Sequence, residues 1–156
     1  MTFEQLEKKY GKQERVDWKQ YENGGGWVHK SATITDKVFV GENAIVWSGV
    51  IYGTARISGG VISGTARISG GVIYGTARIS GGVIYGGKWS TTPLFLTGSC
   101  HSLTNCKPGY IQIGCHCKTI DWWVKNYRDI GKKEGYTDEQ IAEYGLYIEL
   151  FKKIGK

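Results

Sequence analysis

An eleven-residue unit, GTARISGGVIY, recurs in the middle of the chain and constrains its fold more than any other feature. Three complete copies and one degraded copy follow one another, and they begin at Gly53, Gly64, Gly75 and Gly86. The only change within the complete copies is Ser63, which stands where the other two have Tyr74 and Tyr85. A tandem repeat of this kind is one structural unit stacked on itself, so it defines the architecture of its region.

Each unit divides into a six-residue piece, GTARIS, and a five-residue piece, GGVIY, and looser hexads precede them over residues 31–48. Small or aliphatic residues lie two positions apart, as Ala55 and Ile57 do, and such residues share one face of an extended strand. A helix is excluded because each glycine in it would cost about 1 kcal/mol relative to alanine. Isolated hairpins of identical strands would have no fixed register, whereas stacked parallel rungs pair every backbone group.

The repeat therefore predicts a mostly β protein built on a short triangular β-solenoid, or β-helix. Three pieces per coil would give a three-sided prism with coils of about 16–18 residues, whereas two pieces would give a flattened solenoid with coils of about 11. We favour the triangle because the hexads before the repeat fit it. At roughly 4.8 Å per rung, three or four coils make a prism about 15–20 Å long.

The outward side chains of the repeat predict self-association. If Ile62, Ile73 and Ile84 point into the core, the valine before each of them points outward. Three tyrosines would lie on the same outer surface: Tyr52, Tyr74 and Tyr85. Exposed valine and tyrosine are unfavourable for a monomer, and the opposite orientation would expose isoleucine instead. We expect a homo-oligomer, with a trimer as the natural closure of a three-sided prism.

Arginine occupies the same outward position in each repeat, at Arg56, Arg67 and Arg78. Depending on the number of residues per coil, these side chains form a ladder or are spread over different faces. One interpretation is a row that binds anions, and the other is a set of charges that keeps apolar rungs from aggregating. The formal charge of +6 is spread along the chain, which fits an anionic partner and equally a mildly basic soluble protein.

The segments that flank the repeat predict helices and a cap. A short helix over residues 2–11, capped by Thr2, is expected to cover one end of the solenoid, with a flexible joint at residues 24–26. The chain then divides into three parts: an N-terminal helix and linker (1–26), the solenoid repeat domain (27–90) and a small α+β cap (91–156).

Within the cap, the sequence predicts a hairpin followed by two helices. The hairpin has two strands joined by a turn around Lys107-Pro108-Gly109: Pro93–Leu96 and Tyr110–Ile113. Thr119 precedes a helix expected over residues 120–131. Thr137 opens the sequence TDEQ, which fits a capping box for a second helix that runs to about Ile154.

The chain carries no sequence signal for a membrane or for export. No apolar run approaches the roughly 20 residues that span a bilayer, and the N-terminus has no apolar signal core. We therefore expect a cytoplasmic protein without a membrane partner. Binding of nucleic acid is not expected, because lysines do not cluster along the repeat. Four cysteines are expected to be thiols or metal ligands rather than disulfides: Cys100, Cys106, Cys115 and Cys117.

These cysteines, with His101 and His116, are the only candidates for a metal site. Their spacings, C-x5-C and C-x-C, differ from the paired C-x2-C knuckles of zinc sites, so buried thiols with a more exposed His116 are favoured and no cofactor is expected. A hexapeptide-type acyltransferase would need a catalytic histidine, for which His29 and His101 are candidates, but neither has a recognisable partner. GxSxG and HExxH motifs are absent from the sequence, so we do not expect an enzyme.

The chain after about residue 27 resembles a family of phage and prophage proteins with tandem hexapeptide or pentapeptide β-helix repeats. The ARISGGVIYGT array carries the resemblance, together with three tail motifs: GSCHSLTN (98–105), IQIGCHCKTIDWW (111–123) and GYTDEQIAEYGLYIEL (135–150). The resemblance implies a phage origin, a triangular β-helix and a helical cap, and it supplies no catalytic residue.

Two functions follow as hypotheses. The first is an oligomeric anti-defence protein that sequesters a small anionic, nucleotide-like ligand in the host cytoplasm, with arginine on phosphate and aromatic rings on the base. Its expected ligand-binding residues are Arg56, Arg67, Arg78, Tyr52, Tyr74, Tyr85, Trp89 and His101. The alternative is a structural or interaction module that binds a host or virion protein directly.

Overall fold

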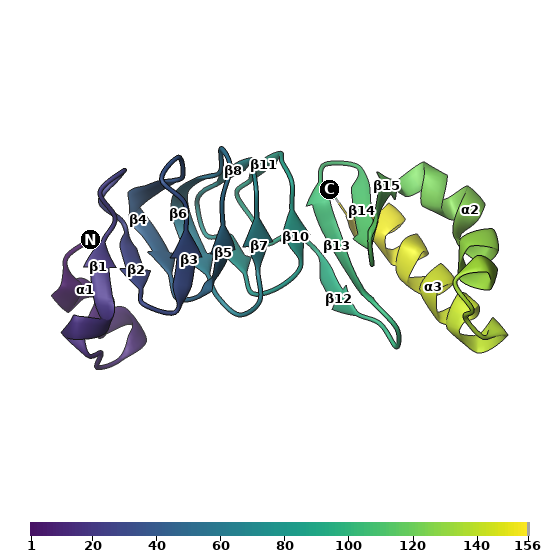
Figure 1. The fold of residues 1–156 in the computed structure, drawn as a ribbon, viewed down its shortest axis with the longest axis horizontal. Helices are drawn as coiled ribbons and strands as arrows, with labels where there is room; N and C mark the ends of the chain where they lie inside the picture. Colours follow the sequence, from purple (N-terminus) through teal and green to yellow (C-terminus); the bar gives the residue numbers. More distant parts are fainter. Residues whose placement is uncertain (156) are drawn as a thin grey trace.

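A parallel β-solenoid forms the N-terminal half of the molecule, and a sheet with two helices follows it (Figure 1). The structure is a computed structural model that describes residues 1–155. The solenoid strands are β2 (Trp27–His29), β3 (Ala32–Ile34), β4 (Phe39–Val46), β5 (Gly49–Ile51), β6 (Arg56–Ile62), β7 (Arg67–Ile68), β8 (Val72–Ile73), β9 (Arg78–Ile79), β10 (Val83–Ile84) and β11 (Lys88–Trp89). The predicted mostly β solenoid is thus confirmed.

The strand register shows three sides per coil. On the first face, Phe39 pairs with Arg56 and Arg56 with Val72, so successive rungs are 17 and 16 residues apart. The second face contains β2, the ends of β4 and β6, and β9. The third contains β3, β5, β7 and β10. A coil of 16 or 17 residues agrees with the predicted triangle and excludes the flattened alternative.

Isoleucine and alanine fill the core of the solenoid. Ile62, Ile73 and Ile84 are fully buried, and so is the alanine of each repeat. The valines before these isoleucines lie on the outside, where Val72 and Val83 stay partly exposed. The predicted inward orientation of isoleucine is therefore correct, and it follows from the alternation of side chains along each strand.

Glycine makes the corners, because the rungs approach each other closely there. Gly64 has φ +61°, and a Cβ atom added to it would come 2.1 Å from the carbonyl oxygen of Ser80 on the next coil. Both the left-handed backbone and the contact require glycine at this position. Gly86 is different, because a Cβ atom there would meet no atom within 4 Å.

The N-terminal helix α1 (Phe3–Tyr10) covers a side of the solenoid. Thr2 caps it, as predicted, and forms a capping box with Gln5, while Leu6 packs against Trp18, Trp27 and Ile45. Trp27 and Ile45 are outward neighbours of the inward Val28 and Val46, so α1 packs against the outer face of the first coils, at the N-terminal end of the solenoid (Figure 1). The short 3-10 helix Arg15–Asp17 and strand β1 (Trp18–Gln20), antiparallel to β2, connect helix and solenoid.

The predicted flexible joint at residues 24–26 is instead packed against the first coil. The Gly26 amide donates to the carbonyl oxygen of Val40 at 2.8 Å, and Gly25 forms a bridge with Gly41. A Cβ atom on Gly24 would lie 2.5 Å from the Val40 oxygen. The three glycines therefore permit close backbone approach, which composition alone does not distinguish from flexibility.

An antiparallel sheet lies between the solenoid and the two C-terminal helices (Figure 1). Tyr110–Ile113 and the turn before it are as predicted, but Ser102–Lys107, not Pro93–Leu96, is the strand that this turn joins to it. The sequence analysis did not predict the strands Ser102–Lys107 and His116–Thr119, because apolar and polar side chains alternate only weakly along them. The elements of the cap are β12 (Phe95–Thr97), β13 (Ser102–Lys107), β14 (Tyr110–Ile113), β15 (His116–Thr119), α2 (Ile120–Lys133) and α3 (Asp138–Ile154).

Thr119 and Thr137 cap α2 and α3 as predicted, and α3 ends at Ile154. One side of the sheet packs against these helices through Leu103, Ile111 and Ile113. The other side closes the last coil, where the Tyr85 amide donates to the carbonyl oxygen of Cys106 at 2.8 Å. Among residues 1–155, no helix is long and apolar enough to cross a membrane.

The close approach at the corners can be tested with two glycines of the repeat. We expect Gly64→Ala to lower the free energy of unfolding by about 1–3 kcal/mol, because the new methyl group meets backbone and φ is positive. Gly86→Ala should change it by less than about 0.5 kcal/mol. Urea denaturation followed by circular dichroism measures both, and equal losses would contradict the coil geometry.

Candidate functional site

The arginines of the repeat lie on three different faces. An eleven-residue repeat covers about two-thirds of a coil, so each copy is rotated relative to the one before it. The register places each arginine next to valine from a neighbouring coil: Arg56 beside Val72, Arg67 between Val50 and Val83, and Arg78 beside Val61. Of the two arrangements considered from the sequence, the structure has the spread one, and among residues 1–155 the repeat arginines form no row.

One face nevertheless combines arginine with two of the expected tyrosines. Each strand β5, β7 and β10 of the third face is followed directly by one of three residues: Tyr52, Ser69 and Tyr85. These residues lie on successive coils, because the Tyr52 amide donates to the carbonyl oxygen of Ile68 and the Ser69 amide to that of Ile84. Arg67 lies two positions before Ser69, on the same outer side. We call Tyr52, Arg67 and Tyr85 the tyrosine–arginine face. Its tyrosines are two rungs, or roughly 10 Å, apart, with the short Ser69 between them.

The other two members of this face, Tyr52 and Arg67, both affect the pKa of Tyr85. Burial, followed by the nearby Cys117, Cys106 and Tyr52, raises the pKa of Tyr85, while the positive charge of Arg67 opposes the rise. Arg67 is exposed and Tyr85 is 42% exposed. The hydroxyl of Tyr85 therefore stays protonated at neutral pH, and the guanidinium remains open to an anion.

The other expected ligand-binding residues are elsewhere. The Arg56 guanidinium lies over the ring of Phe39, 4.2 Å from its centroid, on the first face, where Tyr74 is exposed as well. Arg78 is exposed on the second face. Trp89 is only 2% exposed, and its Nε1 donates to the carbonyl oxygen of Gly86, so it belongs to the core and cannot stack on a ligand.

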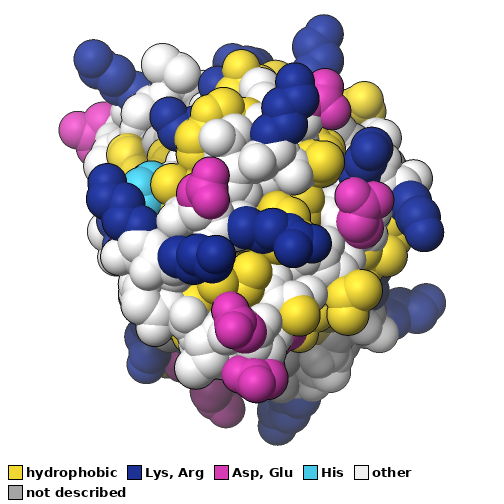
Figure 2. Space-filling view, turned by 90° about the vertical axis from the view of Figure 1, so that its right-hand side faces the viewer, with side chains coloured by type: hydrophobic (Ala, Val, Ile, Leu, Met, Phe, Trp, Pro, Cys, Tyr) yellow, Lys and Arg dark blue, Asp and Glu magenta, His cyan; other side chains and the backbone are white. Residues whose placement is uncertain are grey.

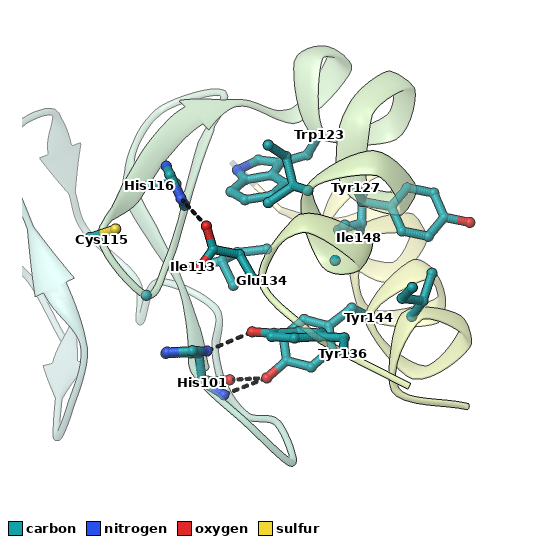
Figure 3. Close-up of a pocket in the computed structure, with 14 residues that line it drawn as sticks. His101, Ile113, Cys115, His116, Trp123, Tyr127, Glu134, Tyr136, Tyr144 and Ile148 are labelled. Atoms are coloured by element: carbon teal, nitrogen blue, oxygen red, sulfur yellow. Dashed lines mark hydrogen bonds and ion pairs between the residues drawn. The ribbon is translucent and has the colours of Figure 1, made fainter. Parts of the chain in front are cut away.

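His101 lines a pocket in the cap, between the sheet and the two helices (Figure 3). The pocket contains about 490 Å³ of empty space, its open mouth included. Its walls are mainly aromatic and aliphatic, among them Ile113, Trp123, Tyr127 and Ile148. None of the described residues that line it is lysine or arginine, so it suits an uncharged molecule better than an anion.

Polar side chains at the pocket mouth are already paired. His101 Nδ1 shares a hydrogen bond with the Tyr136 hydroxyl, and the two rings are stacked. The Tyr144 hydroxyl donates to the carbonyl oxygen of His101 at 2.7 Å and accepts from the Cys100 amide at 3.1 Å. Burial, and then the neighbouring Tyr144, raises the pKa of Tyr136, so its hydroxyl stays protonated at neutral pH.

A second pair, His116 Nε2 and Glu134 Oε1, lies 3.7 Å apart at the same mouth (Figure 3). Sequence analysis did not anticipate Glu134, Tyr136 or Tyr144 here, because they lie 18 to 43 residues from the histidines they meet. No sequence motif predicts the contacts of these three residues with His101 and His116. Its polar groups hold the α2–α3 loop against the sheet, which gives the pocket a structural role.

The four cysteines do not all lie together at one site. Cys106 Sγ and Cys117 Sγ are 3.1 Å apart, whereas Cys100 and Cys115 are exposed, so the prediction of buried thiols is correct for Cys106 and wrong for Cys100 and Cys115. Within residues 1–155, no three or more His, Cys, Asp or Glu side chains gather in a way that could hold a metal ion. Burial, followed by the hydrogen bond to Cys117, raises the pKa of Cys106 to about 12.

The two histidines considered for acyl transfer are engaged in packing. His29 Nε2 lies 3.7 Å from Asp17, and its Nδ1 accepts from the Ser31 amide at 3.2 Å. His29 is at the first coil, whereas His101 is in the cap and stacks on Tyr136. The absence of an enzymatic activity stays a prediction.

Comparison with known proteins adds no identification. No protein-family model, no curated protein and no solved structure matches this chain. The class of protein that the fold defines is therefore a short β-solenoid with a sheet-and-helix cap, and its function rests on the geometry above.

The raised pKa of Cys106 predicts a pH dependence of stability. Its ordinary pKa is 9.0, so between about pH 9 and 12 the unfolded chain has lost the thiol proton that the folded chain keeps. The free energy of unfolding should therefore fall as pH rises through this range, and more steeply in the wild type than in Cys106→Ala. Urea denaturation at several pH values measures the slopes. Cys100→Ala, which alters an exposed thiol, should keep the wild-type slope, and identical slopes in all three proteins would contradict the prediction.

Proposed function

We propose that the protein is a non-enzymatic binding protein for a small anionic, nucleotide-like ligand, which it takes on the tyrosine–arginine face. The observation that carries the proposal is the position of Arg67 between the rungs of Tyr52 and Tyr85. Guanidinium binds phosphate oxygens through two parallel hydrogen bonds, and a tyrosine ring stacks on any base. The face therefore offers both halves of a nucleotide a suitable contact.

Arg56 and Arg78 are weaker candidates than Arg67 for binding the ligand. The Arg56 guanidinium lies over the Phe39 ring. On the second face, the residues beside Arg78 that correspond to Tyr52 and Ser69 of the third face are both serines, Ser63 and Ser80. The formal charge of +6 raises the local concentration of anions over the whole surface without selecting one of them. Selection then depends on the aromatic neighbours of Arg67.

The resemblance to phage proteins suggests the biological setting of this binding. A phage protein that holds a nucleotide signal of a host defence system lowers its free concentration without breaking a bond. Such a role as an anti-defence protein in the host cytoplasm needs abundance and affinity, and it requires no catalytic group. This agrees with a surface built from arginine and tyrosine rather than from acid–base pairs.

Thermal unfolding against a panel of mono-, di- and cyclic nucleotides tests the proposal. At a ligand concentration 100 times Kd, binding should stabilise the protein by about 2.7 kcal/mol. Arg67→Ala should weaken binding at least tenfold. Arg78→Ala removes the equivalent arginine on another face and should bind like the wild type. The proposal fails if no nucleotide stabilises the protein or if both variants lose affinity equally.

Binding to a protein is the second candidate function, favoured by the exposed apolar surface of the solenoid. Tyr74 and Tyr85 are 41% and 42% exposed, and the nearby Val50 and Val83 remain partly exposed. We propose that these surfaces associate into a homotrimer, which would enclose the open tyrosine–arginine face. A host or virion protein is the alternative occupant.

Native mass spectrometry on gently purified protein distinguishes these possibilities. We expect a mass equal to three chains or a multiple of three, and denaturation should release a small anion if the ligand proposal is correct. An empty oligomer that retains one host protein would favour the interaction module. A monomer at all concentrations would contradict the trimer.

A further inference from the structure

Helix α3 carries an apolar stripe on the side that faces away from the hydrophobic core of the cap. Leu146 and Leu150 are 73% and 36% exposed, and their four-residue spacing aligns them along the helix, whereas Ile154 lies beside Leu94 and Phe95. The buried side of α3 has a separate set of apolar residues: Ile141, Tyr144, Ile148 and Phe151. Figure 2 looks onto this end of the molecule and shows apolar side chains between lysine, arginine and acidic ones. The stripe is therefore additional to what the core of the cap requires.

The charges along the same side of α3 change sign from one end to the other. Asp138 and Glu139 lie in the first turn, and Lys152 and Lys153 lie in the last. Glu139 precedes Leu146 by seven residues and Lys153 follows it by seven, so all three occupy one side of the helix at a spacing of two turns. Hydrogen bonds at the helix N-terminus lower the pKa of Glu139, which keeps its side chain negative at neutral pH.

We infer that α3 pairs antiparallel with α3 of a second copy of this chain, around a two-fold axis at Leu146. This arrangement places Leu146 against Leu146 of the partner subunit and Glu139 against Lys153 of the partner subunit. Ala142 and Leu150 lie four residues before and after Leu146, so a small side chain meets a large one. The helix dipoles are also opposed, which favours antiparallel contact.

A second copy fits this surface because the pattern is complementary to itself. A parallel pair would bring Glu139 against Glu139 and Lys153 against Lys153, which is unfavourable. Pairing through α3 is independent of contacts between solenoids. It adds a two-fold axis to a trimer, so the expected assembly has six chains, and three when the stripe is disrupted.

Sedimentation equilibrium of the full chain measures the pairing. Leu146→Glu should halve the mass of the assembly, whether or not the solenoids also associate, and it should leave the far-UV circular dichroism spectrum unchanged because Leu146 is largely exposed. Val16→Glu adds the same charge at a residue that is 87% exposed outside α3, and it should leave the mass unaltered. A wild-type protein without a two-fold contact, or a Leu146→Glu variant with the wild-type mass, would overturn the inference.

A charge exchange tests the antiparallel register itself. Lys153→Glu places two acidic side chains against each other, and at low ionic strength it should weaken pairing about tenfold. Glu139→Lys should do the same, whereas the double variant should return to within about threefold of the wild type. If the single variants pair as well as the wild type, or the double variant fails to recover while it remains helical, this register is overturned.

Discussion

The parallel hydrogen-bond ladder between coils is the interaction on which the rest of the structure depends. It requires each coil to have nearly the same length, here 16 or 17 residues, and three sharp corners between the sides. Glycines such as Gly64, with its positive φ and its close approach to Ser80, make those corners possible. The buried core of these coils consists of alanine, valine and isoleucine together with Trp89, so few residue types build this half of the molecule.

The mismatch between repeat and coil shapes the outer surface. Because an eleven-residue unit does not complete a coil, Arg67 meets Val50 and Val83 rather than another arginine. Like charges are therefore kept apart, and each exposed valine has a charged neighbour that opposes edge-to-edge aggregation. The same rotation places Tyr52 and Tyr85 on the face that carries Arg67, so the separation of the arginines and the tyrosine–arginine face arise from one geometric cause.

The cap solves a different problem, which is how an open stack of strands ends. Its sheet receives the last coil on one side, where the Tyr85 amide bonds to Cys106, and packs helices on the other through Leu103 and Ile113. The polar contacts of His101 with Tyr136 and Tyr144 then hold the α2–α3 loop against the sheet. Leu146, on the far side of α3, stays largely exposed.

The sequence by itself determined the solenoid, its three-sided coil, the inward isoleucines and the caps of the helices at Thr2, Thr119 and Thr137, because these depend on spacing and local hydrogen bonds. Tertiary structure decided that Trp89 is buried and that the glycines at 24–26 are tightly packed. It also decided which arginine meets which tyrosine. The face on which each repeat lies depends on the number of residues per coil, and contacts between residues dozens of positions apart leave no periodic signal in the chain.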